Sequence, residues 1–243
     1  IIHDYAKRDG RIREANTRLS QSPYSHKKRA VHEGVLSSAG EIILTVDADC
    51  RVPRGWIHGM MEYLVRSVDL VAGEVIVEGN SILARLESLE MTGIQAMAAG
   101  LMNIGFPITC NGANLAYRRS AFDRAGGFQG IGRMVSGDDD LLMQKIAKGR
   151  PSRVVFVSGP NTAVRVQAAK TFTELISKRI RWASKIPGYP DFPSVLLLGS
   201  FFLFFAAVCV SFCGIVAGLF APGPLMFGYG LKMSGDLLLT GLG

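Results

Sequence analysis

The stretch that decides the fold of this chain is Glu41-Ile42-Ile43-Leu44-Thr45-Val46-Asp47-Ala48-Asp49-Cys50. Residues 42–46 form an apolar, β-branched run that is too short for a helix and is typical of a buried strand in a parallel sheet. The run ends in Asp47 and Asp49, whose side chains point the same way if the backbone stays extended. Because ligands of open α/β sheets bind at the carboxyl ends of the strands, both carboxylates are predicted to face a ligand.

Two carboxylates at the end of a strand suit a hard divalent cation. Asp47 and Asp49 offer oxygen ligands that fit Mg²⁺ or Mn²⁺, and such an ion can in turn hold a diphosphate. The alternative is a solvated turn after a strand, and an isolated Asp-x-Asp pattern does not separate the two interpretations. The acidic and basic motifs farther along the chain favour the binding site.

The composition differs between the two ends of the chain. The 243 residues suit one α/β domain with additions. The net charge of +7 lies before Phe192, because residues 192–231 carry no charged side chain and Lys232 and Asp236 cancel. A basic part favours anionic partners such as sugar nucleotides or phospholipid headgroups, and the lack of any binding-module signature disfavours nucleic acid. The scattered cysteines fit no disulfide or metal spacing, which indicates a reducing cytoplasmic setting.

Helix and strand patterns alternate around the central strand. Helices are predicted over residues 28–38, 53–65, 81–102 and 120–126 and from the acidic residues 138–140 to residue 148, and strands over 70–78, 115–117 and 153–157. This alternation predicts an α/β domain with a largely parallel, Rossmann-like sheet over residues 1–169.

The remainder of the chain is predicted to meet a membrane. A capping box from Thr171 to Glu174 opens an amphipathic helix within residues 170–190, with an apolar face and a basic face, as in helices that lie in a membrane interface. Residues 195–220, within an apolar region 194–243, are long enough to cross a bilayer of roughly 30 Å. The basic residues before this span predict that its start faces the cytoplasm.

Asp138, Asp139 and Asp140 stand together at a predicted helix start. One interpretation is stabilisation of the helix dipole, worth about 0.3–1 kcal/mol per exposed charge. However, three adjacent carboxylates repel one another, and two would have served the dipole. Repulsion raises the pKa of a carboxylate, which suits a general base.

Two basic clusters have a functional and a simpler interpretation. In the functional interpretation, Arg181 binds a leaving diphosphate and Trp182 offers a flat face to a sugar. In the simpler one, Lys178 and Arg181 form a basic collar before a membrane span, and Trp182 is an aromatic residue at the membrane interface. Lys27 and Lys28, ahead of the central strand, either meet phosphate or form a solvated helix face.

These motifs occur in an order that resembles inverting family 2 glycosyltransferases of the GT-A fold. The matching segments are His26-Lys27-Lys28-x-Ala30, residues 40–49, Asn111-Gly112-Ala113-Asn114, Gly126-Gly127-Phe128, Gly137-Asp138-Asp139 and Arg181-Trp182. The resemblance covers about residues 26–186 and is greatest to the membrane-anchored branch that includes cellulose and hyaluronan synthases.

The resemblance implies a role for each matching residue. Asp139 would be the catalytic base, and Asp47 and Asp49 would hold the metal, Mg²⁺ or Mn²⁺, with the nucleotide diphosphate. It also places these residues at the substrate: Lys27, Lys28, Asp47, Asn111, Gly112, Asp138, Lys178, Arg181 and Trp182. Lys178 departs from the family, which has Gln there, and this difference bears on processive polymer synthesis more than on sugar transfer.

The resemblance also implies an activity. The expected reaction is inverting transfer of a sugar from a UDP- or GDP-sugar to a hydroxyl of a carbohydrate or lipid acceptor, in cell-envelope polysaccharide or glycolipid synthesis. The expected place is the cell (inner) membrane, with the catalytic domain on the cytoplasmic side. The alternatives are a non-catalytic membrane module with the same fold and a polyprenyl-phosphate sugar transferase. Because the chain begins at Ile1 without the family's first strand, we expect it to be a fragment.

Overall fold

The chain divides into two compact units, Ile1–Gly188 and Tyr189–Gly243. The computed structural model describes residues 2–15, 17, 22–65, 67–148, 153–184, 188 and 189, and scattered positions between 195 and 230. The strands and helices discussed below belong to the first unit.

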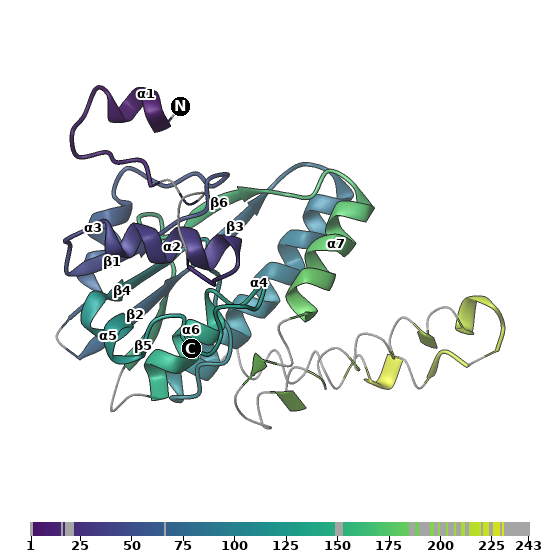
Figure 1. The fold of residues 1–243 in the computed structure, drawn as a ribbon. Coiled ribbons are helices and arrows are strands. Elements are labelled where there is room, and N and C mark those ends of the chain that lie inside the picture. Colours follow the sequence, from purple (N-terminus) through teal and green to yellow (C-terminus); the bar gives the residue numbers. More distant parts are fainter. Residues whose placement is uncertain are drawn as a thin grey trace. The chain divides into compact units, whose positions relative to one another are not determined.

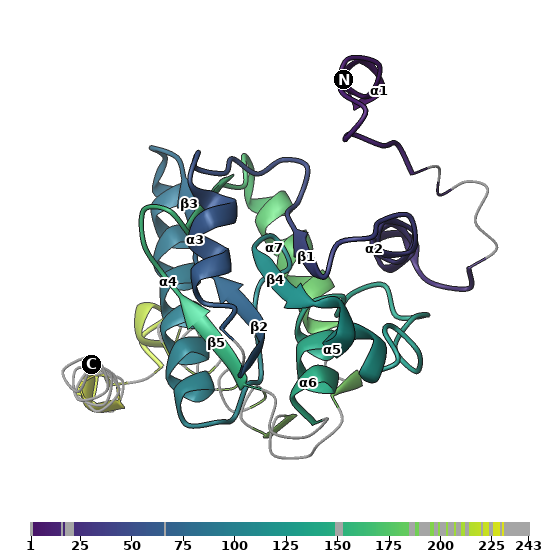
Figure 2. The same cartoon turned by 90° about the vertical axis from the view of Figure 1, so that its left-hand side faces the viewer.

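Four described strands form the central sheet, in the order β1-β4-β2-β5 (Figure 1). They are β1 (Ile42–Thr45), β2 (Val68–Gly73), β4 (Leu115–Arg118) and β5 (Arg153–Val157). Figure 2 shows them side by side in this order. Within the described part of the chain β1 pairs only with β4, so its residues are half-buried instead of buried as the sequence predicted.

The prediction of a largely parallel sheet is wrong for most of the pairing. β1, β2 and β5 run in one direction, but β4 lies between β1 and β2 and is antiparallel to both. The reason lies in the loop before β4. The Asn114 side-chain amide donates to the carbonyls of Glu74 (2.8 Å) and Thr162 (2.7 Å), which holds the start of β4 at the carboxyl edge of its neighbours.

A second, two-stranded sheet consists of β3 (Val75–Glu78) and β6 (Val164–Gln167), which are parallel. The sequence did not predict β6, and it predicted β2 and β3 as one strand. The break falls at Glu74, whose carbonyl accepts the Asn114 amide. Gly73 is required there, because a Cβ would overlap the Asn114 side chain.

Six of the seven described helices lie close to predicted positions, and the first, α1 (Ile2–Ala6), was not predicted. The other six are α2 (His26–Leu36), α3 (Trp56–Glu62), α4 (Ile82–Asn103), α5 (Arg119–Arg124), α6 (Asp140–Lys148) and α7 (Phe172–Ala183). Ser81 caps α4 by accepting the Ala84 N–H at 3.1 Å, and Thr171 caps α7 by accepting the Glu174 N–H at 3.2 Å. These caps satisfy N–H groups that lack partners in the first helical turn.

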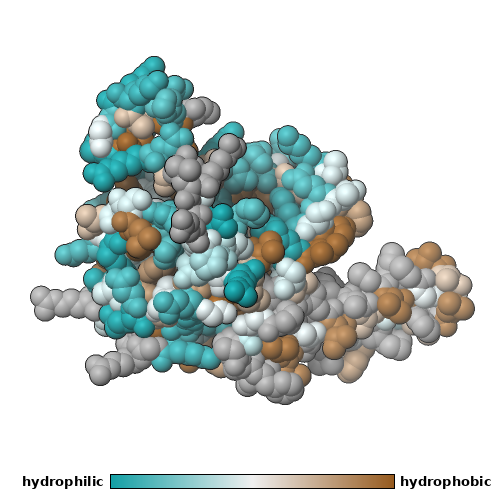
Figure 3. Space-filling model, viewed as in Figure 1, coloured by the Kyte–Doolittle hydropathy of each residue, from teal (hydrophilic) through white to brown (hydrophobic). Residues whose placement is uncertain are grey.

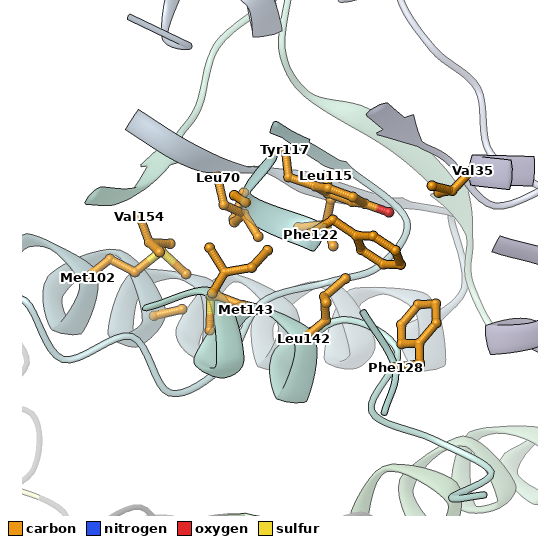
Figure 4. Packing of buried hydrophobic residues seen from close by; sticks show 14 residues of the cluster. Val35, Leu70, Met102, Leu115, Tyr117, Phe122, Phe128, Leu142, Met143 and Val154 are labelled. Carbon is orange, nitrogen blue, oxygen red and sulfur yellow. The ribbon is translucent and has the colours of Figure 1, made fainter. Parts of the chain in front are cut away.

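The central sheet is packed on both faces, because successive side chains of a strand point to opposite sides. Leu70 joins one core with Tyr117 and Met143, which Figure 4 shows between the sheet and the helices. The neighbouring Val71 joins the other core, with Trp56 of α3. The sheet is thus buried between two hydrophobic cores, one on each face.

No described helix is both long and apolar enough to cross a membrane. The predicted span over residues 195–220 falls partly outside the described residues and stays a prediction.

Candidate active site

A cluster of charged side chains lies at the carboxyl edge of the sheet, where β1 ends. The ammonium of Lys27, in the first turn of α2, is 2.7 Å from Asp47 Oδ1 and 3.0 Å from Asp138 Oδ2. Asp47 follows β1 and Asp138 precedes α6, so three segments distant in the sequence meet at one point. Lys27, Asp47 and Asp138 were all predicted site residues.

The loop before β4 orients the predicted base. The backbone N–H of Gly112 donates to Asp139 Oδ2 at 3.0 Å, and the Asp140 N–H donates to Asp139 Oδ1 at 2.8 Å. A Cβ at Gly112 would come within 3.1 Å of Asp139 Cβ and 3.2 Å of the Lys27 ammonium. Asn111 shapes this loop, because its side-chain oxygen accepts the Ala113 N–H at 3.0 Å.

The three acidic residues before α6 have different surroundings. Asp140 is fully buried and its Oδ1 accepts the Leu141 N–H at 2.9 Å, which fits the helix-start interpretation. Asp138 pairs with Lys27, and Asp139 is held by Gly112. The helix dipole therefore accounts for one of the three, and two carboxylates are left at the site.

Burial and charge shift the pKa values of the cluster. Burial and the negative charge of Asp139 raise the pKa of Asp138, and the ammonium of Lys27 offsets only part of this. Burial by itself would lower the pKa of Lys27, but Asp138 and Asp47 outweigh it, so the net effect is a raised pKa. Lys27 therefore stays protonated, and an anionic ligand would compete with Asp138 and Asp47 for its ammonium.

The raised pKa of Asp138 leads to a prediction for Asp138→Asn. Because the pKa is higher in the folded than in the unfolded state, wild-type stability falls as the pH rises from the unfolded value through the folded value. Asn has no proton to lose. The melting temperature of the variant minus that of the wild type should therefore increase with pH in this window and then level off. Thermal melts between about pH 4 and pH 8 measure this, and a difference that shrinks with rising pH would contradict it.

Asp49 lies differently from the sequence prediction. β1 ends at Thr45, and the Cys50 N–H donates to the Asp47 carbonyl at 3.0 Å, so the two carboxylates lie in a turn and not on an extended strand. Asp49 is exposed, whereas Asp47 is half-buried beside Lys27.

Asp47 and Asp49 fit a divalent ion that is bound jointly by the protein and a phosphate ligand. Asp47 and Asp49 supply hard oxygen ligands, and Mg²⁺ typically takes one or two carboxylates and completes its shell with water and phosphate oxygens. Among the described residues, no group of three or more His, Cys, Asp or Glu side chains could hold an ion. Water and the oxygens of a bound diphosphate would complete the ligand set.

Lys28 has a different position from the one predicted. The sequence suggested contact with phosphate, but the side chain is fully buried, and its ammonium donates to the carbonyls of Met134 (2.8 Å) and Ser136 (2.6 Å). Sequence reasoning missed this, because adjacent lysines look alike in a sequence. They point in directions about 100° apart on a helix.

Two basic residues of α7, Lys178 and Arg179, face α4. Lys178 lies 3.3 Å from Glu87, which is only 3% exposed, and Arg179 forms a two-pronged ion pair with Glu90. Lys178 thus forms an ion pair between helices, and its contact with substrate stays a prediction. Trp182 stacks under the Arg179 guanidinium, 4.5 Å from the ring centre, and Arg181 is exposed.

Comparison with known protein families shows the family to which the chain belongs. The model of the family described as "Glycosyl transferase family group 2" matches residues 42–234. The chain belongs to this family. The family 2 glycosyltransferase match includes the carboxylates of the site and the acidic residues before α6.

Comparison with curated proteins gives no match. Two solved structures of glucosyl-3-phosphoglycerate synthase from Mycobacterium tuberculosis are similar to this family 2 chain, with 17% and 18% sequence identity and TM-scores of 0.39. One contains phosphoglyceric acid, and the other contains Mn²⁺, UDP-glucose and glycerol 3-phosphate. The similarity covers 73% of this chain, which spans 60% of the length of that enzyme.

Proposed function

We propose that this domain transfers a sugar from a nucleotide-diphosphate sugar, UDP- or GDP-linked, to an acceptor hydroxyl with inversion. The observation that carries the proposal is the cluster of Lys27, Asp47, Asp138 and Asp139 at the carboxyl edge of the sheet, with the Gly112 N–H on Asp139. It combines an oriented carboxylate that can accept a proton with the Lys27 ammonium and with carboxylates that could hold a divalent ion, and the two cations together would offset the charge of a diphosphate.

In the proposed reaction each residue has one task. Asp139 removes the proton of the acceptor hydroxyl as its oxygen attacks the anomeric carbon, and the bond to the diphosphate breaks on the opposite side. Lys27 attracts the diphosphate, which gains negative charge as it leaves. When bound at Asp47 and Asp49, a divalent ion would supply additional positive charge for the leaving group.

Arg181 and Trp182 are proposed to act on the donor from α7. Arg181 is exposed, as a residue awaiting an anionic ligand should be. Trp182 is held by Arg179. A guanidinium binds phosphate oxygens in a two-pronged geometry, and an indole ring offers an apolar face to a sugar.

The test is a screen of radiolabelled UDP- and GDP-sugars with membranes that contain the full-length protein. Transfer to an endogenous or added acceptor supports the proposal. Recovery of the label in an extracted polyprenyl phosphate would assign the protein to the polyprenyl-phosphate sugar transferases. Donor binding without transfer or hydrolysis for any donor would point to a non-catalytic module.

We also propose that the domain works at a membrane, on the cytoplasmic side of the cell (inner) membrane, in polysaccharide or glycolipid synthesis. The support is the orientation of α7. Its charged residues Lys178 and Arg179 face α4, so its apolar residues point outward: Phe172 is 67% exposed and Ile180 is 65% exposed. This polarity is opposite to that of an ordinary surface helix.

α4 also exposes apolar side chains beside α7. Glu87 points inward, while Ile82, Leu86 and Leu89 are exposed at 80%, 58% and 72%. Figure 3 shows apolar surface in this region. Apolar side chains on adjacent helices, close to the exposed cations Arg85 and Arg181, fit the surface of an anionic bilayer.

A fluorophore at position 176 should therefore sense lipid. We expect quenching by brominated lipids when Ile176→Cys is labelled in full-length protein reconstituted in bilayers, after the native cysteines are replaced. Ile57 of α3 is 64% exposed outside this surface and is the matched control position. Equal quenching at positions 176 and 57, or none at 176, would contradict the membrane orientation.

A further inference from the structure

The first turn of α2 carries two neighbouring lysines with different surroundings. Lys27 lies among the carboxylates of the site, whereas Lys28 is fully buried. A buried ammonium is costly unless hydrogen bonds replace its water. Its bonds to the carbonyls of Met134 and Ser136, at 2.8 and 2.6 Å, supply this replacement.

The segment before Lys28 holds the same loop. The Ser25 N–H donates to the Gly132 carbonyl at 2.8 Å, and the Ser25 hydroxyl donates to the Met134 carbonyl at 2.7 Å. The Tyr24 ring lies so close to Gly132 that a Cβ there would overlap it. Residues 24–28 therefore fix residues 132–136, which contain no helix or strand of their own.

This loop leads directly to the carboxylates of the site. Gly137, with φ of 82°, turns the chain from Ser136 to Asp138. Asp138 lies 3.0 Å from the Lys27 ammonium, and Asp139 lies 3.0 Å from the Gly112 nitrogen. A displacement of the loop would therefore move both carboxylates away from these partners. On the other side of the site, residues 138–140 are fixed by the start of α6.

We propose that Lys28 is a positioning residue, which holds the loop 132–136 so that Asp138 and Asp139 keep their places. The inference rests on the proposed glycosyl transfer. It assigns different tasks to the two lysines: Lys27 contacts the diphosphate, and Lys28 holds the backbone that leads to the base. Lys28 itself touches neither donor nor acceptor.

Lys28→Met tests this, because Met keeps the length of the side chain and removes its charge and N–H donors. We expect the turnover number kcat to fall by about tenfold to a hundredfold, since small displacements of catalytic groups cost this much. The KM for the donor should change little, because Lys27 and Asp47 remain. The exchange of amide hydrogens over residues 132–139 should accelerate in the donor-free protein.

Lys145→Met is the matched control. Lys145 also ties a loop through two carbonyls, donating to Gly127 O at 2.6 Å and Gln129 O at 2.7 Å. This loop carries no residue of the site. We expect this variant to lose stability and to keep kcat and the wild-type exchange rates of residues 132–139.

Ser25→Ala covers the case in which Lys28→Met does not fold. It removes one of the bonds to the Met134 carbonyl and should give the same changes in smaller measure. The proposal is overturned if the Lys28→Met and Ser25→Ala variants keep the wild-type exchange rates and the wild-type kcat. It is also overturned if Lys28→Met raises the donor KM and leaves kcat unchanged, because Lys28 would then be a donor ligand. The exchange experiment needs no substrate. If the wild type transfers no sugar, the proposed function fails, and exchange alone decides whether Lys28 holds the loop.

Discussion

Asp139→Asn is expected to lower the rate of sugar transfer by about a hundredfold or more. Asn has the shape of Asp but cannot accept the proton of the acceptor hydroxyl. Its side-chain oxygen can still accept one of the two backbone N–H groups, from Gly112 and Asp140, that hold the carboxylate. The fold and the binding of the donor should therefore survive. Initial rates with the donor found in the screen, together with the affinity for UDP or GDP, measure both effects.

Asp138→Asn is the necessary companion, because burial and the charge of Asp139 raise the pKa of Asp138 and make it the other candidate for a base. We expect a smaller loss in this variant. The loss is limited because Lys27 keeps one carboxylate partner, Asp47, at 2.7 Å. A large loss in Asp138→Asn with near-normal transfer in Asp139→Asn would show that Asp138 is the base.

The second large effect is expected at Asp49. Asp49→Ala should abolish the part of UDP or GDP binding that depends on Mn²⁺ or Mg²⁺, because it removes the exposed carboxylate that is accessible to an ion. One oxygen of Asp47 is already paired with the Lys27 ammonium. The binding of an ion together with a diphosphate should therefore depend more on Asp49 than on Asp47. Calorimetric titrations of the full-length protein with nucleotide, with and without the ion, give the difference.

Asp69→Ala is a suitable control for this titration. Asp69, in β2, is paired with Arg124 at 2.9 Å, and this ion pair contains no residue of the site. Its replacement should leave the metal-dependent affinity at the wild-type level. An unchanged metal-dependent affinity in Asp49→Ala would remove Asp49 from the proposed metal site and leave Lys27 and Arg181 as the cations for the diphosphate.

Most elements of the fold, but not α1, β6 or the break between β2 and β3, could be predicted from local sequence. The apolar run before Asp47 indicated β1, and the capping residue Thr171 marked the start of α7. These features depend on neighbours in the chain, because caps and hydrophobic periodicity are local. The grouping of Asp47, Asp138 and Asp139 was predicted only through the resemblance to a family, since their separation along the chain contains no spatial information.

What the sequence by itself determined was therefore the order of the elements and the chemical types at the carboxyl edge of the sheet. Only the tertiary structure decided the reversed direction of β4, the burial of Lys28 and the pairing of Lys178 with Glu87. The physical reason is the same in each case. A side chain such as Asn114, Lys28 or Glu87 finds its hydrogen-bond partners in segments far away in the sequence, and the need to satisfy a buried polar group there outweighs the local pattern.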